Sequence, residues 1–197
     1  MLSEAARKIF AVLSAGQPAR GTELTDDERH AARELQLLTM KPLIYVANVD
    51  EQQLKDGFRL PGVPENMQVP LSVKMEEEVA SLPSEEVREY MDALGLQETG
   101  LDRLIRAAYE LLGLLTYFTS GEVETRAWTV HHGDKAPVAA GVIHTDFEKN
   151  FIRAEVINWR DFVEFGESGC RDRGKLRIEG KDYVMQDGDV CHFRVGA

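Results

Sequence analysis

An amide and a carboxylate stand three positions apart in Asn48-Val49-Asp50-Glu51, directly after a short apolar run. Ligands of open α/β sheets bind outside the carboxyl ends of the strands, which is where such a motif is useful. The amide of Asn48 can hydrogen-bond the edge of a purine ring, and the carboxylate of Glu51 can accept a hydrogen bond from the base. A surface loop that caps a helix explains the same residues without a ligand. The motif therefore identifies a candidate reader of a purine base and nothing more.

The residue types around the amide bear on which purine is read. Guanine-specific GTPases use Asn-Lys-x-Asp, and the Asp pairs with two N–H donors of guanine. Adenine lacks that pair of donors. Here Glu51 is longer than that Asp, and Val49 stands where the Lys would be. The base specificity of the motif is therefore expected to differ from that of the guanine-specific GTPases.

A second short motif, Ser72-Val73-Lys74, ends the next apolar run. In GTPase-like folds a Ser-Ala-Lys turn in this place presents a backbone N–H to the purine, and here Val73 replaces the Ala. Ser72 can also serve as the N-cap of the helix that follows, and both interpretations can hold together. The predicted base site is thus Asn48, Glu51, Ser72, Val73 and Lys74.

The stretch 169–175 fits GxxxxGK, the beginning of a phosphate-binding P-loop. The next residue is Leu176, so the hydroxyl that would hold Mg²⁺ is missing. We expect a strand after this stretch, whereas a P-loop needs a helix whose N-terminus faces the phosphates. No GxxxxGK[ST] occurs in residues 1–197. A phosphate cradle is therefore not predicted.

Four basic residues alternate along the same stretch, and in an extended segment they would share one face: Arg171, Arg173, Lys175 and Arg177. Such a row can follow an RNA backbone, so these are candidate RNA contacts. A solvated edge strand kept basic against aggregation is the favoured explanation of the same residues. Cys170 and Cys191 have no CxxC spacing and are expected to be reduced thiols, and no metal site is predicted.

The first 38 residues are expected to form two short antiparallel helices. Apolar residues recur at helical spacing from Leu2 to Leu13, before Gly16 and Pro18. A second helix opens with a capping box formed by Thr25 and Glu28. Neither helix has enough apolar surface to stand alone, so residues 1–38 are interpreted as the end of a longer helical arm.

Residues 39–113 predict the edge of a parallel α/β sheet. The run 43–47 is rich in β-branched and aromatic residues and predicts a strand buried on both faces, and 69–73 predicts a second strand. Helices are expected over 74–80, 84–94 and 99–112. With only two strands, this sheet is incomplete.

From Thr116 the chain turns to β structure, and residues 114–197 predict a ubiquitin-like β-grasp domain. Its helix is expected at 137–143, and its strands at 125–130, 151–157, 175–178, 183–185 and 192–195. The fold class is therefore α+β: a C-terminal β-grasp domain preceded by a partial P-loop-type α/β domain and the end of a helical arm.

Composition limits the function classes. The chain has 197 residues, 43% hydrophobic and 29% charged, which is typical of a globular protein. A net charge of −11 argues against indiscriminate nucleic-acid binding. No run approaches the roughly 20 apolar residues of a membrane span, and the first residues do not resemble a signal peptide. A cytoplasmic location without a membrane partner is expected.

Longer runs of the sequence show a resemblance to a known family, for which the short motifs alone are too unspecific. The chain resembles the Obg-like ATPase (YchF) family over essentially its whole length, in the runs 38–51, 115–119, 126–130, 140–149, 151–156 and 179–183. The resemblance implies that the C-terminal β-grasp domain is of the TGS type. It also implies a P-loop ATPase that associates with ribosomes, with a candidate RNA-facing groove between the arm and the TGS domain.

The family's preference for ATP over GTP is attributed to its N-x-x-E motif. Carried over, Asn48 and Glu51 would read the base, with Ser72, Val73 and Lys74 lining its far side. The resemblance implies ATP with Mg²⁺ as cofactor of the complete protein, and the ribosome or RNA as partner. It places the P-loop and both switch regions before Met1, so this chain alone is expected to be inactive and to bind ATP weakly.

A second interpretation comes from a different class of protein. The chain can be a non-enzymatic TGS-containing module that binds RNA, the ribosome or another protein without a nucleotide. An in-frame P-loop upstream of Met1 would favour the ATPase, and an unrelated upstream gene would favour the module.

Overall fold

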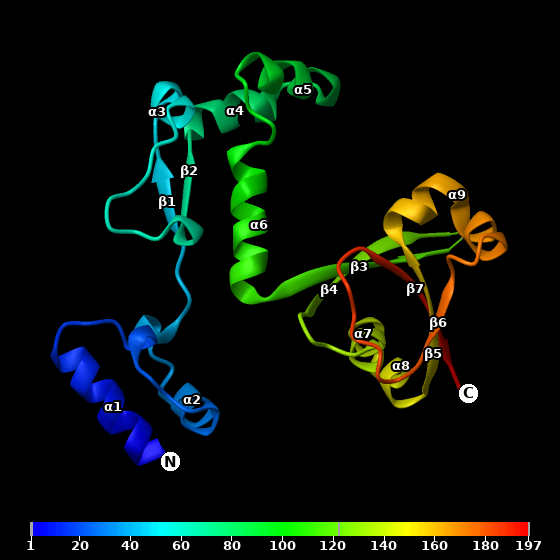
Figure 1. Ribbon diagram of the computed structural model, residues 1–197, viewed down its shortest axis with the longest axis horizontal. Helices are drawn as coiled ribbons and strands as arrows, with labels where there is room; N and C mark the ends of the chain where they lie inside the picture. The colour runs from blue at the N-terminus through cyan, green and yellow to red at the C-terminus, as the bar shows by residue number, and fades with distance from the viewer. Residues whose placement is uncertain (1, 122, 197) are drawn as a thin grey trace. The chain divides into compact units, whose positions relative to one another are not determined.

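The computed structural model describes residues 2–121 and 123–196 and divides the chain into two compact units, Met1–Ala107 and Ala108–Ala197 (Figure 1). Each unit has a hydrophobic core of its own. Within the described ranges, no helix is both long and apolar enough to cross a membrane. The three-part division expected from the sequence stays a prediction.

The first unit opens with α1 (Leu2–Ser14) and α2 (Asp26–Ala32), as predicted. Glu28 N–H donates to Thr25 Oγ1 at 3.3 Å, and Thr25 N–H donates to Glu28 Oε2 at 2.9 Å, so the predicted capping box is formed. Glu28 also accepts from Lys8 Nζ at 2.8 Å, which ties α2 to α1. Three 3₁₀ turns complete this part: η1 (Ala19–Gly21), η2 (Arg33–Leu35) and η3 (Leu38–Met40).

Two parallel strands follow, β1 (Tyr45–Asn48) and β2 (Gln68–Leu71), in a two-stranded sheet. The prediction that the first strand is buried on both faces was wrong, because Tyr45 is 41% and Val46 is 49% exposed. Only β2 pairs with β1 among the described strands, so β1 keeps an unpaired side and much of its apolar surface. The sheet is incomplete, as expected.

Helices surround the carboxyl ends of these strands. The predicted helices are present as α4 (Val73–Ser81), α5 (Ser84–Ala93) and α6 (Gly100–Leu112). A five-residue helix, α3 (Glu51–Lys55), was not predicted, and a 3₁₀ turn η4 (Glu65–Met67) precedes β2. The core formed by β1, α3 and α4 consists of Ala47, Val49, Leu54 and Met75.

The second unit is a β-grasp fold, as predicted. Its strands are β3 (Leu114–Ser120), β4 (Thr125–His131), β5 (Phe151–Asn158), β6 (Arg177–Glu179) and β7 (Asp189–Val195). Their order is β4-β3-β7-β5-β6; β3 and β7 are parallel, and the other neighbours are antiparallel. Between β4 and β5 lie α7 (Ala136–Ile143), the predicted helix, and α8 (Thr145–Lys149).

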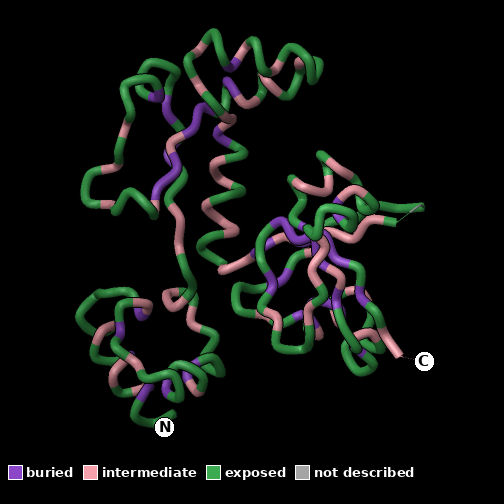
Figure 2. The backbone as a smooth tube through the Cα atoms, turned by 45° about the vertical axis from the view of Figure 1, so that its right-hand side comes forward, coloured by how far each residue is buried: buried purple, intermediate pink, exposed green. Residues whose placement is uncertain are grey.

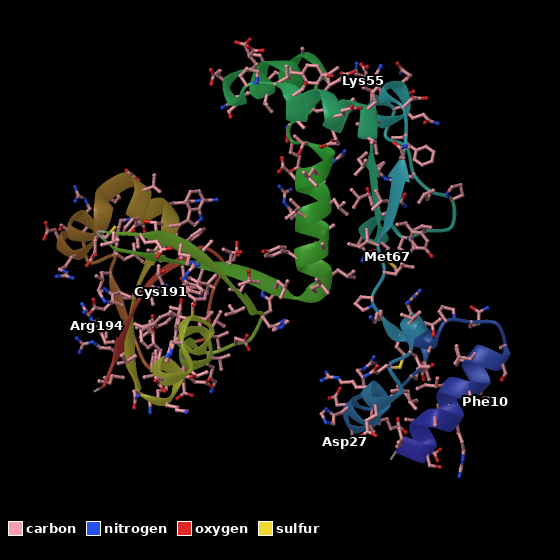
Figure 3. All side chains as sticks on the ribbon, turned by 180° about the vertical axis from the view of Figure 1, so that it is seen from behind. Phe10, Asp27, Lys55, Met67, Cys191 and Arg194 are labelled. Atoms are coloured by element: carbon pink, nitrogen blue, oxygen red, sulfur yellow. The ribbon has the colours of Figure 1, made fainter. Side chains whose placement is uncertain are left out.

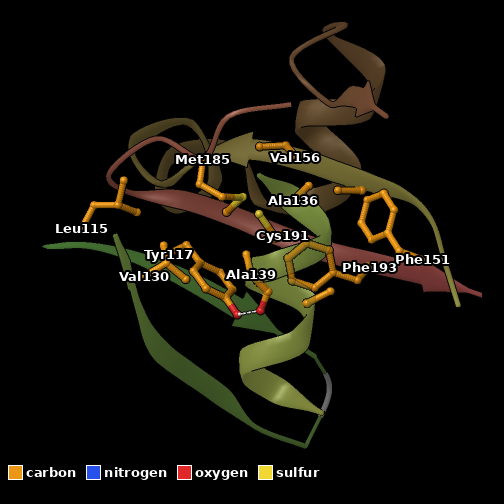
Figure 4. Close-up of a cluster of buried hydrophobic side chains, with 12 residues drawn as sticks. Leu115, Tyr117, Val130, Ala136, Ala139, Phe151, Val156, Met185, Cys191 and Phe193 are labelled. Carbon is orange, nitrogen blue, oxygen red and sulfur yellow. Dashed lines mark hydrogen bonds between the residues drawn. The ribbon is translucent and has the colours of Figure 1, made fainter. Parts of the chain in front are cut away.

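The alanine-rich face of α7 lets the helix lie close to the sheet. Ala136, Ala139 and Ala140 are fully buried against core residues from β3, β5 and β7 (Figure 4). Tyr117 Oη donates to the carbonyl of Ala139 at 2.7 Å, and this burial raises the pKa of Tyr117. Buried residues recur along β3, β5 and β7, whereas α6 is exposed or half-buried along most of its length (Figure 2).

Four details of this unit differ from the prediction. The strand β3 and the helices α8 and α9 (Trp159–Asp172) were missed, and residues 183–185 contribute only one bridge, between Val184 and Lys135. Helix α9 begins because Asn158 accepts the Arg160 N–H at 3.0 Å. It is interrupted at Gly166, whose φ of 66° only glycine adopts at little cost, and this break obscures the helical period in the sequence.

Candidate nucleotide-base site

The two predicted base-reading motifs lie at the same edge of the two-stranded sheet (Figure 1). Asn48 is the last residue of β1, and its partner in the parallel register is Leu71, the last residue of β2. Ser72 follows directly and occupies the N-cap position of α4. Parallel pairing therefore brings together two segments that are 24 residues apart in the chain.

A hydrogen bond joins the two motifs. Asn48 Oδ1 accepts the backbone N–H of Val73 at 3.2 Å. The bond uses the acceptor end of the amide and leaves its Nδ2 group as the donor for a ligand. Of the backbone N–H groups of the turn 72–74, that of Val73 is thus engaged by Asn48 in this structure.

The short helix α3 positions Glu51. Asp50 is its N-cap: Asp50 Oδ1 accepts from Gln53 N–H at 2.8 Å, and Gln53 Oε1 accepts from Asp50 N–H at 3.1 Å. The helix-capping interpretation of this motif therefore holds for Asp50, while Asn48 and Glu51 stay exposed. Glu51 Oε1 accepts from Lys55 Nζ at 2.6 Å, from the other end of α3 (Figure 3).

Val49 has a structural role. It is 8% exposed and packs in the core with Ala47, Leu54 and Met75. Guanine readers carry a Lys at this position of the motif. Here the side chain of residue 49 belongs to the interior of the unit.

A hollow of about 470 Å³ lies between the two motifs, lined by Asn48, Val49, Asp50, Glu51, Ser72, Lys74, Met75 and Glu78. It contains every predicted base-site residue except Val73. Ser72 makes no side-chain capping hydrogen bond although it is buried, so its predicted role as a capping side chain was wrong. The Ser72 carbonyl accepts from Glu76 N–H at 3.0 Å instead.

Glu78 is the residue that sequence reasoning missed. It forms an ion pair with Lys74 at 3.8 Å and accepts a hydrogen bond from Tyr90 Oη, which raises the pKa of Tyr90. The i, i+4 spacing of Lys74 and Glu78 on α4 was the signal that could have found it.

The charge of the hollow distinguishes between parts of a nucleotide. Three carboxylates line it, from Asp50, Glu51 and Glu78, against the single ammonium of Lys74. Like charges that close to a phosphate are unfavourable, whereas carboxylates accept hydrogen bonds from an amino group on a base. The hollow therefore suits the base and disfavours the phosphates. Among the described residues, no group of three His, Cys, Asp or Glu side chains gathers as metal ligands.

The predicted basic row does not form. Arg171 lies in the last turn of α9, Arg173 is its C-cap, and Gly174 turns the chain with a φ of 67° before Arg177 enters β6. Because the segment is helix and turn rather than strand, alternation in sequence does not place these side chains on one face.

Three of the four basic side chains of this segment are also neutralised by carboxylates. Arg171 pairs with Glu167 at 3.1 Å, Lys175 with Asp161 at 2.5 Å, and Arg177 with Glu179 and the buried Asp189, each at 3.3 Å. Arg173 stacks on the ring of Phe165. Residues 169–172 of the 169–175 stretch lie in the last turn of α9, and in the described residues after it, 176–196, strands form and no helix begins, so the stretch lacks the geometry of a P-loop.

Comparison with known proteins extends the resemblance. The family model YchF-GTPase_C, described as "Protein of unknown function (DUF933)", matches residues 114–196. The chain is 46% identical over 197 residues to the ribosome-binding ATPase YchF of Bacillus subtilis, and 49% identical over 194 residues to that of Haemophilus influenzae. These matches cover 95% of this chain and 54% and 53% of the relatives. The structure of the Schizosaccharomyces pombe YchF GTPase superposes with a TM-score of 0.82 at 35% identity, covering 97% of this chain and 53% of that chain.

The chain belongs to the YchF family. It spans about half the length of the curated YchF relatives that it matches. Obg-like ATPase 1 of S. pombe is a more distant relative, 38% identical over 191 residues, with 91% of this chain and 48% of the relative covered.

Proposed function

We propose that this chain supplies the adenine-reading edge of a nucleotide site and the β-grasp domain of a ribosome-binding, ATP-preferring YchF protein. The observation that carries the proposal is the hydrogen bond between Asn48 and Val73, which joins the motif of Asn48 and Glu51 to the turn after β2 at the ends of two parallel strands.

The chemistry of the two purines accounts for the direction of the preference. Adenine carries an amino group where guanine carries a carbonyl oxygen. A carboxylate from Glu51 or Glu78 accepts from the amino group and repels the carbonyl. The Asn48 Nδ2 donates to a ring nitrogen that both purines have, so it contributes affinity and little selectivity. A site built to pair with one group rejects an analogue that lacks it.

The phosphates of ATP and their Mg²⁺ need groups that this hollow does not provide. When bound, Mg²⁺ neutralises charge on the phosphates during phosphoryl transfer. Residues 1–197 contain no P-loop sequence, and the carboxylates of the hollow oppose a phosphate. In the proposed protein these groups belong to other sequence, and this chain holds the base.

The names of the relatives support the proposed partner. Curated YchF relatives at 46–49% identity are called ribosome-binding ATPases. A ribosome partner would place the protein in the cytoplasm. The β-grasp unit would be the TGS-type domain expected from the resemblance.

Nucleoside binding tests the base site without phosphates. A ¹⁵N-labelled chain titrated with adenosine should show amide shifts at Asn48, Glu51 and Lys74, with weak affinity because a few hydrogen bonds contribute only about 0.5–1.5 kcal/mol each. Guanosine should shift them less. The variant Asn48→Ala should lose the response, and Asn66→Ala, outside the hollow, should keep it.

Equal responses to adenosine and guanosine would remove the specificity argument. Absence of any response in the wild-type chain would favour the other interpretation, a nucleotide-independent binding module.

A further inference from the structure

The carboxylates that line the hollow of the base site have different partners. Asp50 accepts the Gln53 N–H as the N-cap of α3. Glu51 accepts from Lys55 Nζ at 2.6 Å, so an ammonium on its own helix neutralises it. Glu78 of α4 instead accepts a hydrogen bond from Tyr90 Oη of α5, and this donor is uncharged. A neutral hydroxyl fixes a carboxylate and leaves its negative charge in place.

One oxygen of Glu78 stays free for a ligand. The bond from Tyr90 uses Oε2. The other oxygen, Oε1, lies 3.8 Å from Lys74 Nζ, which is too long for a hydrogen bond. The Lys74 side chain is 85% exposed, so this contact is a weak surface ion pair. Lys74 and Glu78 are four residues apart on α4, and both line the hollow, so this face of the helix presents the carboxylate to it.

Tyr90 holds the Glu78 side chain from a second helix. Its ring is half-buried on α5. The hydrogen bond to Glu78 raises the pKa of Tyr90 above its ordinary value, and burial and the charges of Glu78 and Glu51 raise it further. The phenol therefore keeps its proton at neutral pH and remains a donor. Because the bond joins two helices, it restricts rotation of the Glu78 carboxylate.

The orientation of the Asn48 amide limits what that residue can distinguish. On one edge of a purine, N7 lies beside the group at position 6: adenine offers an acceptor and an amino donor there, and guanine offers two acceptors. An Asn reads adenine by donating to N7 and accepting from the amino group. Here Asn48 Oδ1 already accepts the Val73 N–H at 3.2 Å. Discrimination at position 6 therefore requires a second acceptor in the hollow.

We infer that Glu78 is the specificity-determining residue of the base site. Its Oε1 accepts from the 6-amino group of adenine while Asn48 Nδ2 donates to the neighbouring ring nitrogen. Guanine places a carbonyl oxygen opposite the same carboxylate, and two acceptors without a proton between them repel each other. Tyr90 is a positioning residue that acts through Glu78. The inference rests on the proposed function, and it assigns to Glu78 the selectivity that the N-x-x-E motif attributes to Glu51.

Four nucleosides test the inference: adenosine, inosine, guanosine and purine riboside, each titrated into the full ¹⁵N-labelled chain. Purine riboside carries only a hydrogen at position 6, so its affinity reports the contact with Asn48 alone. The wild-type chain should bind adenosine roughly tenfold more tightly than purine riboside, because the added hydrogen bond has a charged acceptor. Inosine and guanosine carry a carbonyl at position 6 and should bind more weakly than purine riboside.

Substitutions on α4 and α5 then separate recognition from stability. Glu78→Gln supplies an amide that pairs with an amino group or a carbonyl alike, so the ratio of adenosine to inosine affinity should fall roughly tenfold. Its affinity for purine riboside should not change, whereas a damaged fold would weaken all four nucleosides together. Tyr90→Phe should lower the same ratio by a smaller factor, since the carboxylate remains but is no longer held. Glu77→Gln, on α4 outside the hollow, removes the same charge and should change nothing.

Three outcomes overturn the inference. If Glu78→Gln keeps the adenosine-to-inosine ratio and Glu51→Gln loses it, Glu51 is the selective residue, and the proposed function stands. If the wild-type chain binds adenosine and purine riboside equally, the 6-amino group is not read, and a remaining preference over guanosine would still support the proposed function. If no nucleoside binds the wild-type chain, the inference and the proposed base site fail together.

Discussion

Asn48 Oδ1 accepts the backbone N–H of Val73 at 3.2 Å, and this bond closes the carboxyl end of the two-stranded sheet. It links the proposed purine-reading motif of the first strand to the turn after the second. It also fixes which end of the Asn48 amide is left for a ligand. Both the stability of this edge and its proposed binding of a base depend on one side chain.

Replacing Asn48 should therefore affect folding and binding together. Asn48→Ala removes an exposed hydrogen bond, so the free energy of unfolding should fall by about 0.5–1.5 kcal/mol. Asn48→Asp keeps the acceptor for the Val73 N–H but loses the Nδ2 donor. It should retain stability and lose adenosine binding, as measured by denaturant unfolding and NMR titration. Loss of stability without loss of binding in Asn48→Asp would contradict the assigned orientation of the amide.

Changing the motif into one that recognises guanine should lower the stability of the first unit. From the sequence, Glu51→Asp with Val49→Lys is expected to move the preference from ATP towards GTP once the phosphate-binding sequence is supplied. Val49 is 8% exposed, so a Lys there should cost about 1–3 kcal/mol of unfolding free energy. Val46→Lys, in the adjacent strand β1, is the matched control, because Val46 is 49% exposed, and it should be nearly neutral. If both Lys variants unfold at the same denaturant concentration, residue 49 is not part of the core.

The capping box of α2 should make the first unit sensitive to acid. Hydrogen bonding to Lys8, followed by that to the Thr25 N–H, lowers the pKa of Glu28 below its ordinary value. A lowered carboxyl pKa contributes stability above the pKa of the unfolded chain, about 4.3, and this contribution is lost as the pH falls through the folded pKa. Glu28→Gln should flatten the melting temperature against pH in that acidic range. Glu23→Gln should not alter the curve.

Replacing the basic residues of the segment 171–177 tests two roles: stabilising the second unit and contacting RNA. Arg177 reaches the buried Asp189 at 3.3 Å, so Arg177→Ala should destabilise this unit by about 1–3 kcal/mol by leaving that carboxylate poorly paired. Replacing Arg171 and Arg173 with Ala removes charge without uncovering Asp189. The salt slope of RNA binding by this double variant decides whether the segment contacts RNA. An unchanged slope would discard it.

Purified chain should not hydrolyse ATP. Phosphoryl transfer needs a cradle of backbone N–H groups, a Lys on the phosphates and a Mg²⁺ ligand, and residues 1–197 contain no P-loop sequence. Phosphate release should equal the no-enzyme control, and no saturable binding should occur at micromolar ATP. Mg²⁺-dependent turnover that copurifies with the chain would overturn this expectation, and Lys175→Ala would then be the first variant to make.

The sequence alone determined the features that depend on neighbours in the chain. The capping box at Thr25 and Glu28, the helices of the first unit other than α3, and the helix predicted at 137–143 all follow from spacings of a few residues. The long matching runs determined the family, because such runs specify an entire fold at once. The β-grasp topology followed from strands and a helix arranged in that order.

Only the tertiary structure decided what lies between distant segments. The register of β1 against β2 placed Asn48 on the Val73 N–H, and packing buried Val49 and brought Glu78 into the hollow. The break at Gly166 and the helix α9 dispersed the basic row. These outcomes depend on pairing and packing between residues far apart in the chain, which local spacing does not encode.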